Sequence, residues 1–299
     1  MKDKVKKPLF NMEMDKSDQG LLAFLRFMGL LVFLIAAAII IKNELPTWFS
    51  SIEEETGKSD VVGQKAENCN VSGILLRGDV VTYISPADYN DNGGITVDEG
   101  SSEVVASKID RAEKDDDIKA IILEVDSYGG SGVAGEEIAN ALKKAKKPTV
   151  VLIRNGAASA AYWAATGAGR IFASQNSDIG GIGVTMSYLD NVKQNQKMGY
   201  TYNLLSSGKF KDTGNPDKPL TKEEVKLLMR DVNIMHQNFI KAVSVNRRIE
   251  LEKVAGLADG STMLGEVALQ NNLIDQIGGQ AEVNQYLKDK IGVEPEICW

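Results

Sequence analysis

The segment AIILEVDSYGGSGVAGEEIANALKKAKKPTVVLIRNGAASAAYW, residues 120–163, determines the fold class. Two short runs of mainly β-branched residues, 120–125 and 149–153, have the composition of strands buried on both faces. Residues 133–146 between them show the spacing of an amphipathic helix. Because a strand-helix-strand order implies a right-handed crossover, the segment predicts an α/β protein with a mainly parallel sheet.

The same alternation continues on both sides of this segment. Further strands are expected at 71–76, 170–173 and 200–205, further helices at 103–114, 188–197 and 221–248, and a last αβα-like segment at 265–288. Thr221 is expected to cap the long helix, with Glu224 at the capping-box position. The expected packed face of that helix comprises Met229, Val232, Met235, Phe239 and Val243.

Residues 21–41, LLAFLRFMGLLVFLIAAAIII, are long and apolar enough to cross a bilayer as one helix. Lysines dominate before this span and glutamates after it, which favours a cytoplasmic N-terminus. The sequence thus predicts a cytoplasmic segment (1–20), a single-pass transmembrane signal anchor (21–41) in the cell membrane, a polar linker (42–70) and an extracytoplasmic domain (71–299). The Ala36-Ala37-Ala38 run leaves signal-peptidase cleavage open, although the apolar residues that follow it favour an uncleaved anchor.

Charge and cysteine content narrow the possible partners. The net charge of −7 argues against a nucleic-acid partner, because binding of phosphates needs a basic surface. No metal-ligand spacing or phosphate loop occurs, so neither a metal nor a cofactor is predicted. Cys69 and Cys298 flank the extracytoplasmic domain, and either a disulfide or two free thiols fits their positions.

Ser159 is the candidate nucleophile. It follows the 149–153 strand, precedes a helical run and is surrounded by alanines, which leave room for a peptide carbonyl. The chain's single histidine, His236, lies in the long helix, so a Ser-His-Asp triad is disfavoured. The surroundings of Ser159 also depart from G-x-S-x-G, and a plain helix cap is the competing interpretation.

Two glycine-rich segments are candidates for substrate binding. The turn at 126–132 contains Gly129-Gly130 directly after a strand, where backbone N–H groups can form an oxyanion hole. In the second, an extended substrate is expected to pair with the backbone of Gly181, Ile182 and Gly183. The competing interpretation of both segments is a tight turn.

A lysine is the candidate general base. Lys211 follows Ser159 by 52 residues, next to Phe210 and Asp212, and nearby Lys209 is an alternative. To accept a proton at neutral pH, a lysine needs its pKa lowered from about 10.4 to about 7, which corresponds to roughly 4–5 kcal/mol. A solvated loop lysine is the competing interpretation.

Together these motifs resemble the signal peptide peptidase A family, whose fold, shared with Clp protease and crotonase, consists of repeated ββα units. The similarity is carried in order by 126–130, 157–163 and 207–212, and then by shorter matches at 221–224, 258–260 and 273–278. Several family positions differ here: Asp126 and Tyr128 replace asparagine and proline, Ala160 and Ala161 replace glycines, and Ser261 replaces arginine.

The resemblance implies a serine endopeptidase with a Ser159-Lys211 dyad and an oxyanion hole formed by Gly129, Gly130 and Ala160. It also implies peptide or unfolded-protein substrates, among them remnant signal peptides and other extended membrane-associated polypeptides. Short family forms are expected to assemble as homo-oligomeric rings that share the dyad between protomers. A catalytically inactive membrane scaffold that binds peptides is the main alternative, and a crotonase-like acyl-CoA enzyme is a weaker one.

Overall fold

The computed structural model describes residues 69–88 and 99–299, which belong to one compact unit of residues 62–299. The strands are β1 (Val71–Val81), β2 (Glu99–Ser101), β3 (Ala120–Gly130), β4 (Thr149–Ala158), β5 (Arg170–Ala173), β6 (Asp178–Gly180), β7 (Thr262–Leu264), β8 (Gln276–Ile277) and β9 (Ile297–Cys298). The helices are η1 (Pro86–Asp88, a 3-10 helix), α2 (Ser102–Lys114), α3 (Gly132–Lys144), α4 (Ala160–Ala165), α5 (Val192–Lys197), α6 (Lys222–Arg247), α7 (Leu251–Gly256), α8 (Gly265–Gln270) and α9 (Gln280–Ile291).

The predicted N-terminal segment, the transmembrane anchor at 21–41 and the linker up to residue 68 lie outside the described residues. Among residues 69–88 and 99–299, no helix combines the length and the apolar character that a membrane span requires.

The described strands form one sheet with the order β2-β1-β3-β4-β5-β8, in which all neighbours are parallel. β6 continues the pairing along β4, β9 pairs with β1, and β7 is antiparallel to β6. The mainly parallel sheet is therefore confirmed. Because β3 and β4 run side by side, their carboxyl ends bring the turn after Tyr128 next to Ser159.

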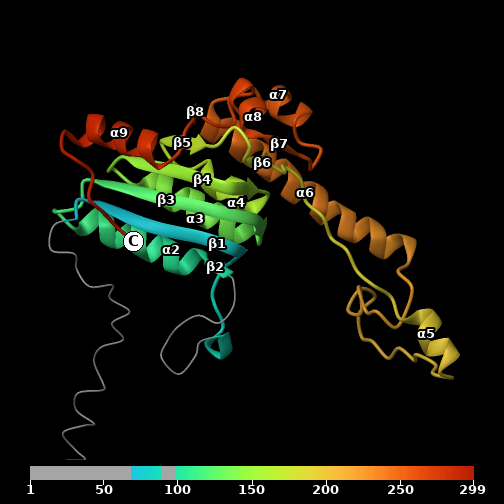
Figure 1. Ribbon diagram of the computed structural model, residues 1–299. Coiled ribbons are helices and arrows are strands. Elements are labelled where there is room, and N and C mark those ends of the chain that lie inside the picture. Colours follow the sequence, from blue (N-terminus) through green and yellow to red (C-terminus); the bar gives the residue numbers. More distant parts are fainter. Residues whose placement is uncertain (1–68, 89–98) are drawn as a thin grey trace, which may run out of the picture. The chain divides into compact units, whose positions relative to one another are not determined.

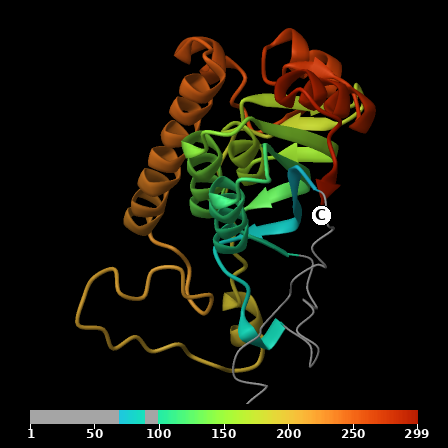
Figure 2. The same cartoon turned by 90° about the vertical axis from the view of Figure 1, so that its left-hand side faces the viewer.

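Alternating side chains of the central strands fill two separate apolar layers. One layer, with Ile121 and Leu123 of β3, packs under α2, α3 and α4. The other, with Ile122 of β3 and Leu152 of β4, is covered by Val283 and Leu287 of α9. Figures 1 and 2 show these helices on opposite faces of the sheet. Burial on both faces explains why the strand segments of the sequence are continuously apolar.

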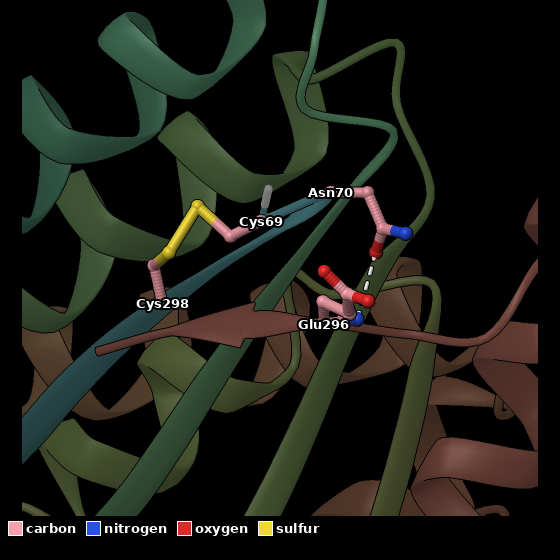
Figure 3. Close-up of a disulfide and its surroundings, with 4 residues drawn as sticks. All are labelled: Cys69, Asn70, Glu296 and Cys298. Atoms are coloured by element: carbon pink, nitrogen blue, oxygen red, sulfur yellow. Dashed lines mark hydrogen bonds between the residues drawn. A yellow bond between two sulfur atoms is a disulfide. The ribbon is translucent and has the colours of Figure 1, made fainter. Parts of the chain in front are cut away.

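A disulfide joins the two cysteines, so the question left open by the sequence is resolved. The Cα atoms of Cys69 and Cys298 are 5.8 Å apart, within the usual range for such a bond. Beside the disulfide, the Glu296 N–H donates to the Asn70 side-chain oxygen at 2.9 Å (Figure 3). The bond thus attaches the C-terminal strand β9 to β1, the first strand of the domain.

Helix α6 has the predicted ends but only part of the predicted packed face. Thr221 caps it, and its capping box includes Glu224. Val232, Phe239 and Val243 are buried, as expected from their spacing, whereas Met229 and Met235 are exposed. The helix contacts the core through its C-terminal half and extends past it at the other end (Figure 1).

Between β6 and α6, one predicted strand is wrong and one predicted helix is shorter than expected. Residues 200–205 form no strand, and their apolar side chains face solvent, Leu205 at 98% exposure. The helix predicted over 188–197 is confined to α5, Val192–Lys197. We refer to residues 184–220 as the arm. An apolar alternation alone does not make a strand, since a strand also needs a partner for its backbone.

Candidate active site

Ser159 occupies the turn between β4 and α4 in a strained conformation. Its φ of 52° and ψ of −127° are rare for a residue with a side chain, at a cost of about 1–3 kcal/mol. The hydroxyl does not cap α4, although Ser159 stands at the N-cap position, and it makes no hydrogen bond with any described residue. The helix-cap interpretation is therefore excluded. A strained serine at a strand-to-helix turn has the geometry of a nucleophile elbow.

Surrounding backbone groups hold Ser159 in this turn. Its N–H donates to the Gly180 carbonyl at 2.8 Å, and its carbonyl accepts from the Trp163 N–H at 2.9 Å. The Trp163 ring stacks on Phe239 of α6 with 4.8 Å between the ring centroids. The strain is thus balanced by a buried aromatic contact and by the β4–β6 pairing.

One of the two predicted oxyanion glycines, Gly129, lies directly against Ser159, whereas Gly130 lies against Val80 of β1. A Cβ placed on Gly129, whose φ is 115°, would lie 2.7 Å from the Ser159 Cβ and 3.1 Å from the Ala160 nitrogen. The Gly129 N–H itself donates to Ser127 Oγ at 3.1 Å. Ala160 is the first residue of α4, where N–H groups lack a partner within the helix. The Gly129 N–H is thus already used, which leaves the N–H groups of Gly130 and Ala160 as the remaining candidate donors for an oxyanion.

A pocket of about 440 Å³ adjoins this turn. It is lined by the end of β1, including Val80, and by Gly130 and Ser131. The pocket thus opens beside one of the two candidate oxyanion donors. Ser159 itself does not line the pocket.

The second glycine segment also lies at this site, but part of its backbone is already paired. Gly181 N–H donates to the Ser261 carbonyl, and the Ile182 carbonyl accepts from Gly260. A Cβ on Gly181 would lie 3.1 Å from the Ser159 nitrogen, which places the segment beside the nucleophile. Gly183 makes no backbone hydrogen bond with a described residue, so pairing with a substrate is possible only from about this residue onward.

Lys211 lies far from Ser159 of the same chain. It is exposed in a loop attached to the first turn of α6 by the 2.7 Å ion pair between Lys209 and Glu223. Phe239 contacts the core 16 residues further along α6, an axial rise of about 24 Å at about 1.5 Å per residue. A general base must lie within about 3 Å of the proton that it abstracts. The structure therefore assembles the Ser159 half of the predicted site without its lysine.

A polar network orders the loop that carries Lys211. Asp212 accepts from the Tyr202 hydroxyl at 2.7 Å and from the Asn215 amide at 3.1 Å, and these bonds lower the pKa of its carboxyl. The same bond to Asp212 raises the pKa of Tyr202 to about 12. Lys218, at 2.7 Å, lowers the pKa of Glu224 to about 2, with support from the backbone of Thr221. The Lys211 loop is thus held to α5 and α6 rather than to the sheet.

Sequence reasoning missed several residues that shape the site. Ser127 Oγ donates to the Gly78 carbonyl at 2.6 Å while accepting from Gly129, and so links β1 to the oxyanion turn. Gly135 lets α3 approach α4, since a Cβ there would lie 2.4 Å from the Ala160 carbonyl oxygen. Tyr128 contacts the end of β4. A single sequence carries no signal for such contacts, because they join segments that are distant along the chain.

Comparison with known proteins finds matches to two protein families and to several curated proteins. Residues 141–294 match the model of peptidase family S49, and residues 93–179 match that of Clp protease. A protein of Methanocaldococcus jannaschii, "Putative protease MJ0651", is 33% identical over 70% of this chain and 69% of its own length. "Putative signal peptide peptidase SppA" of Enterococcus faecium is 29% identical over 80% and 67%, respectively.

Two further matches differ in extent. "Protease 4" of Haemophilus influenzae is 30% identical over 73% of this chain, but the match covers only 33% of that longer protein. The structure of a ClpP1 mutant of Listeria monocytogenes covers 70% of this chain and 92% of its own, at 14% identity and a TM-score of 0.46. The family-model match spans the arm, α6 and the C-terminal elements, and the match to the M. jannaschii protein covers more than two thirds of both chains. The chain belongs to peptidase family S49, with an α/β fold of the Clp protease type.

Proposed function

We propose that the protein is a membrane-anchored serine endopeptidase with a Ser159-Lys211 dyad. The observation that carries the proposal is the strained turn at Ser159, whose hydroxyl makes no hydrogen bond with a described residue and whose Cβ lies against Gly129. Strain of this kind persists only where the surrounding structure maintains it, and it is concentrated at functional sites. Membership of family S49 supports peptide hydrolysis as the chemistry.

In the proposed reaction, Ser159 Oγ attacks the scissile carbonyl carbon while neutral Lys211 accepts the hydroxyl proton. The carbonyl oxygen becomes an oxyanion stabilised by the N–H groups of Gly130 and Ala160. When the C–N bond breaks, Lys211 returns the proton to the leaving amine, and an acyl-enzyme remains. Water then attacks the ester with Lys211 again as base, which releases the acid product and restores the serine.

The lysine in each site is proposed to come from a neighbouring protomer of a ring. About 24 Å along α6 separates the Lys211 loop from the core contact near Ser159 of the same chain. The arm also exposes apolar side chains in extended backbone, with Leu189 at 89% and Leu205 at 98% exposure. Exposed apolar surfaces of this kind are typical of protein interfaces, and a second copy of the chain could bury them while bringing its Lys211 to the site.

Substrates are proposed to be extended polypeptides at the membrane, including remnant signal peptides. The name of the E. faecium relative, together with the apolar span at 21–41, supports this choice. The Cys69–Cys298 disulfide supports an extracytoplasmic domain, because disulfides persist in oxidising compartments.

The alternative of an inactive scaffold rests on alanines where the resembling family has glycines. Ala160 and Ala161 lie in α4, and neither has a positive φ. Alanine adopts a helical conformation without strain, so these replacements leave the turn at Ser159 intact. Their side chains are buried rather than directed into the pocket beside Gly130. The departures therefore give no reason to expect an inactive site.

The test is hydrolysis of an unfolded protein by detergent-solubilised full-length enzyme. Ser159→Ala and Lys211→Ala should each abolish turnover while leaving thermal unfolding and assembly unchanged. Lys197→Ala is the matched control, since it removes another exposed lysine of the arm that forms no ion pair with a described residue, and Lys209→Ala separately tests the alternative base. Turnover retained in either Ser159→Ala or Lys211→Ala would reject the dyad.

A further inference from the structure

Tyr128 connects three strand ends at the site. It lies at the end of β3, immediately before Gly129. Its hydroxyl accepts from the Asn155 amide at 2.6 Å and donates to the Asp178 carboxylate at 3.3 Å. Asn155 belongs to β4, which leads into the nucleophile turn, and Asp178 begins β6, so the phenol oxygen links β3 to both of these strands.

The tyrosine ring packs where β4 carries no side chain. A Cβ on Gly156 would lie 3.3 Å from two ring atoms of Tyr128, so the ring rests on the bare backbone of this glycine. Gly156 pairs with Asp178, and two residues later Ala158 pairs with Gly180, whose carbonyl holds the Ser159 N–H. A shift of Tyr128 is therefore transmitted both to Gly129 and to the backbone around Ser159.

The hydroxyl remains a donor at neutral pH. Desolvation, the charge of Asp178 and the hydrogen bond to it raise the pKa of Tyr128. The side chain is nevertheless 57% exposed, so removing its hydroxyl opens no cavity in the core. A change at this atom should therefore affect geometry at the turn with little effect on the stability of the domain.

We propose that Tyr128 is a positioning residue of the peptidase site, whose hydroxyl ties the ends of β3, β4 and β6 together and so fixes Gly129-Gly130 against Ser159. This inference rests on the proposed function. The tyrosine touches no reacting atom in this role. It acts by positioning the oxyanion donors. The position of these donors affects the rate because they stabilise the negative charge that develops on the substrate oxygen in the transition state.

The test compares wild type with Tyr128→Phe, which keeps the ring on Gly156 and removes only the hydroxyl. We expect kcat to fall about ten-fold, less than the roughly 10²–10³-fold loss of an entire oxyanion donor, with KM nearly unchanged. Tyr286→Phe is the matched control, because the Tyr286 hydroxyl on α9 makes no hydrogen bond with a described residue. It should behave as wild type.

Two inhibitors separate positioning from simple binding. Both carry a peptide sequence that the enzyme cleaves in its protein substrate, and one ends in an aldehyde while the other ends in the corresponding alcohol. Ser159 Oγ adds to the aldehyde carbon as its proton passes to the general base, and the former carbonyl oxygen of the resulting hemiacetal occupies the oxyanion position. Tyr128→Phe should weaken the aldehyde about ten-fold and the alcohol by less than about two-fold. Asn155→Ala combined with Tyr128→Phe should add nothing to the loss caused by Tyr128→Phe alone.

Wild-type kcat in Tyr128→Phe, or equal weakening of the aldehyde and the alcohol, would overturn the inference. These outcomes differ from failure of the proposed function, in which Ser159→Ala would retain activity or the wild type would show none that depends on Ser159.

Discussion

Mixed assemblies of two inactive variants should regain activity, because the site is proposed to take Ser159 and Lys211 from different protomers. The Lys211 loop lies about 24 Å along α6 from the core contact beside Ser159, so a single chain cannot close the dyad. In a ring in which each protomer serves one neighbour, an equal random mixture of Ser159→Ala and Lys211→Ala rebuilds about one site in four. Each variant alone rebuilds none.

The assay is hydrolysis of a fluorescent unfolded protein after the two purified variants are dissociated and reassembled together. Active sites are counted by a serine-directed covalent probe, and mixed assembly is verified with distinct affinity tags. The matched control replaces either partner by the double variant Ser159→Ala/Lys211→Ala, which cannot complete a site from either side. Absence of recovery in confirmed mixed rings would refute sharing of the dyad.

Three further predictions concern stability. Phe239→Ala should lower the free energy of unfolding by about 3–5 kcal/mol, because the ring is buried and stacked on Trp163. Urea denaturation measures this loss, and a value below about 1 kcal/mol would contradict the prediction. Cys298→Ser should lower the free energy of unfolding by about 2–5 kcal/mol, because it opens a disulfide whose cysteines are 229 residues apart in the sequence. The variant should have a lower Tm than wild type, and adding a reductant should lower the Tm of wild type but not that of the variant. The pKa of Glu224 is about 2, below its ordinary 4.5, so the ionised carboxylate stabilises the fold above pH 4.5 and this contribution is lost as the pH falls toward 2. Glu224→Gln should therefore have a lower Tm than wild type at neutral pH, and its Tm should depend less on pH between 4.5 and 2. Parallel curves of Tm against pH for the two proteins would contradict the assignment.

Local patterns were sufficient for the sheet and for half of the site. The runs at 120–125 and 149–153 are apolar on both faces because helices cover both faces of the sheet. Continuously apolar strands of this kind are typical of parallel sheets that are buried on both faces. Their shared direction places Gly129 of the glycine turn beside Ser159. The capping box at Thr221 was predictable for the same reason, since all of its contacts are local.

The errors occur where a segment depends on something beyond its own neighbourhood. Residues 200–205 alternate as a strand does, yet no partner strand for them exists in the described part of the chain. Met229 and Met235 share a helical stripe with Phe239, yet both are exposed, although Val232 between them is buried. Periodicity shows which face of an element is apolar, without showing what covers it. The position of Lys211 relative to Ser159 likewise depends on contacts between segments that are distant in the sequence, which periodicity does not reveal.

Covalent labelling of Ser159 tests the central claim most directly. Full-length enzyme is treated with a fluorophosphonate, and the modified residue is identified by peptide mass spectrometry in wild type and in Lys211→Ala. The account predicts that wild type is labelled at Ser159 and that Lys211→Ala is labelled at least about a hundred-fold more slowly, as expected when the general base is lost. Labelling at another residue, or equal rates in the two proteins, would contradict it.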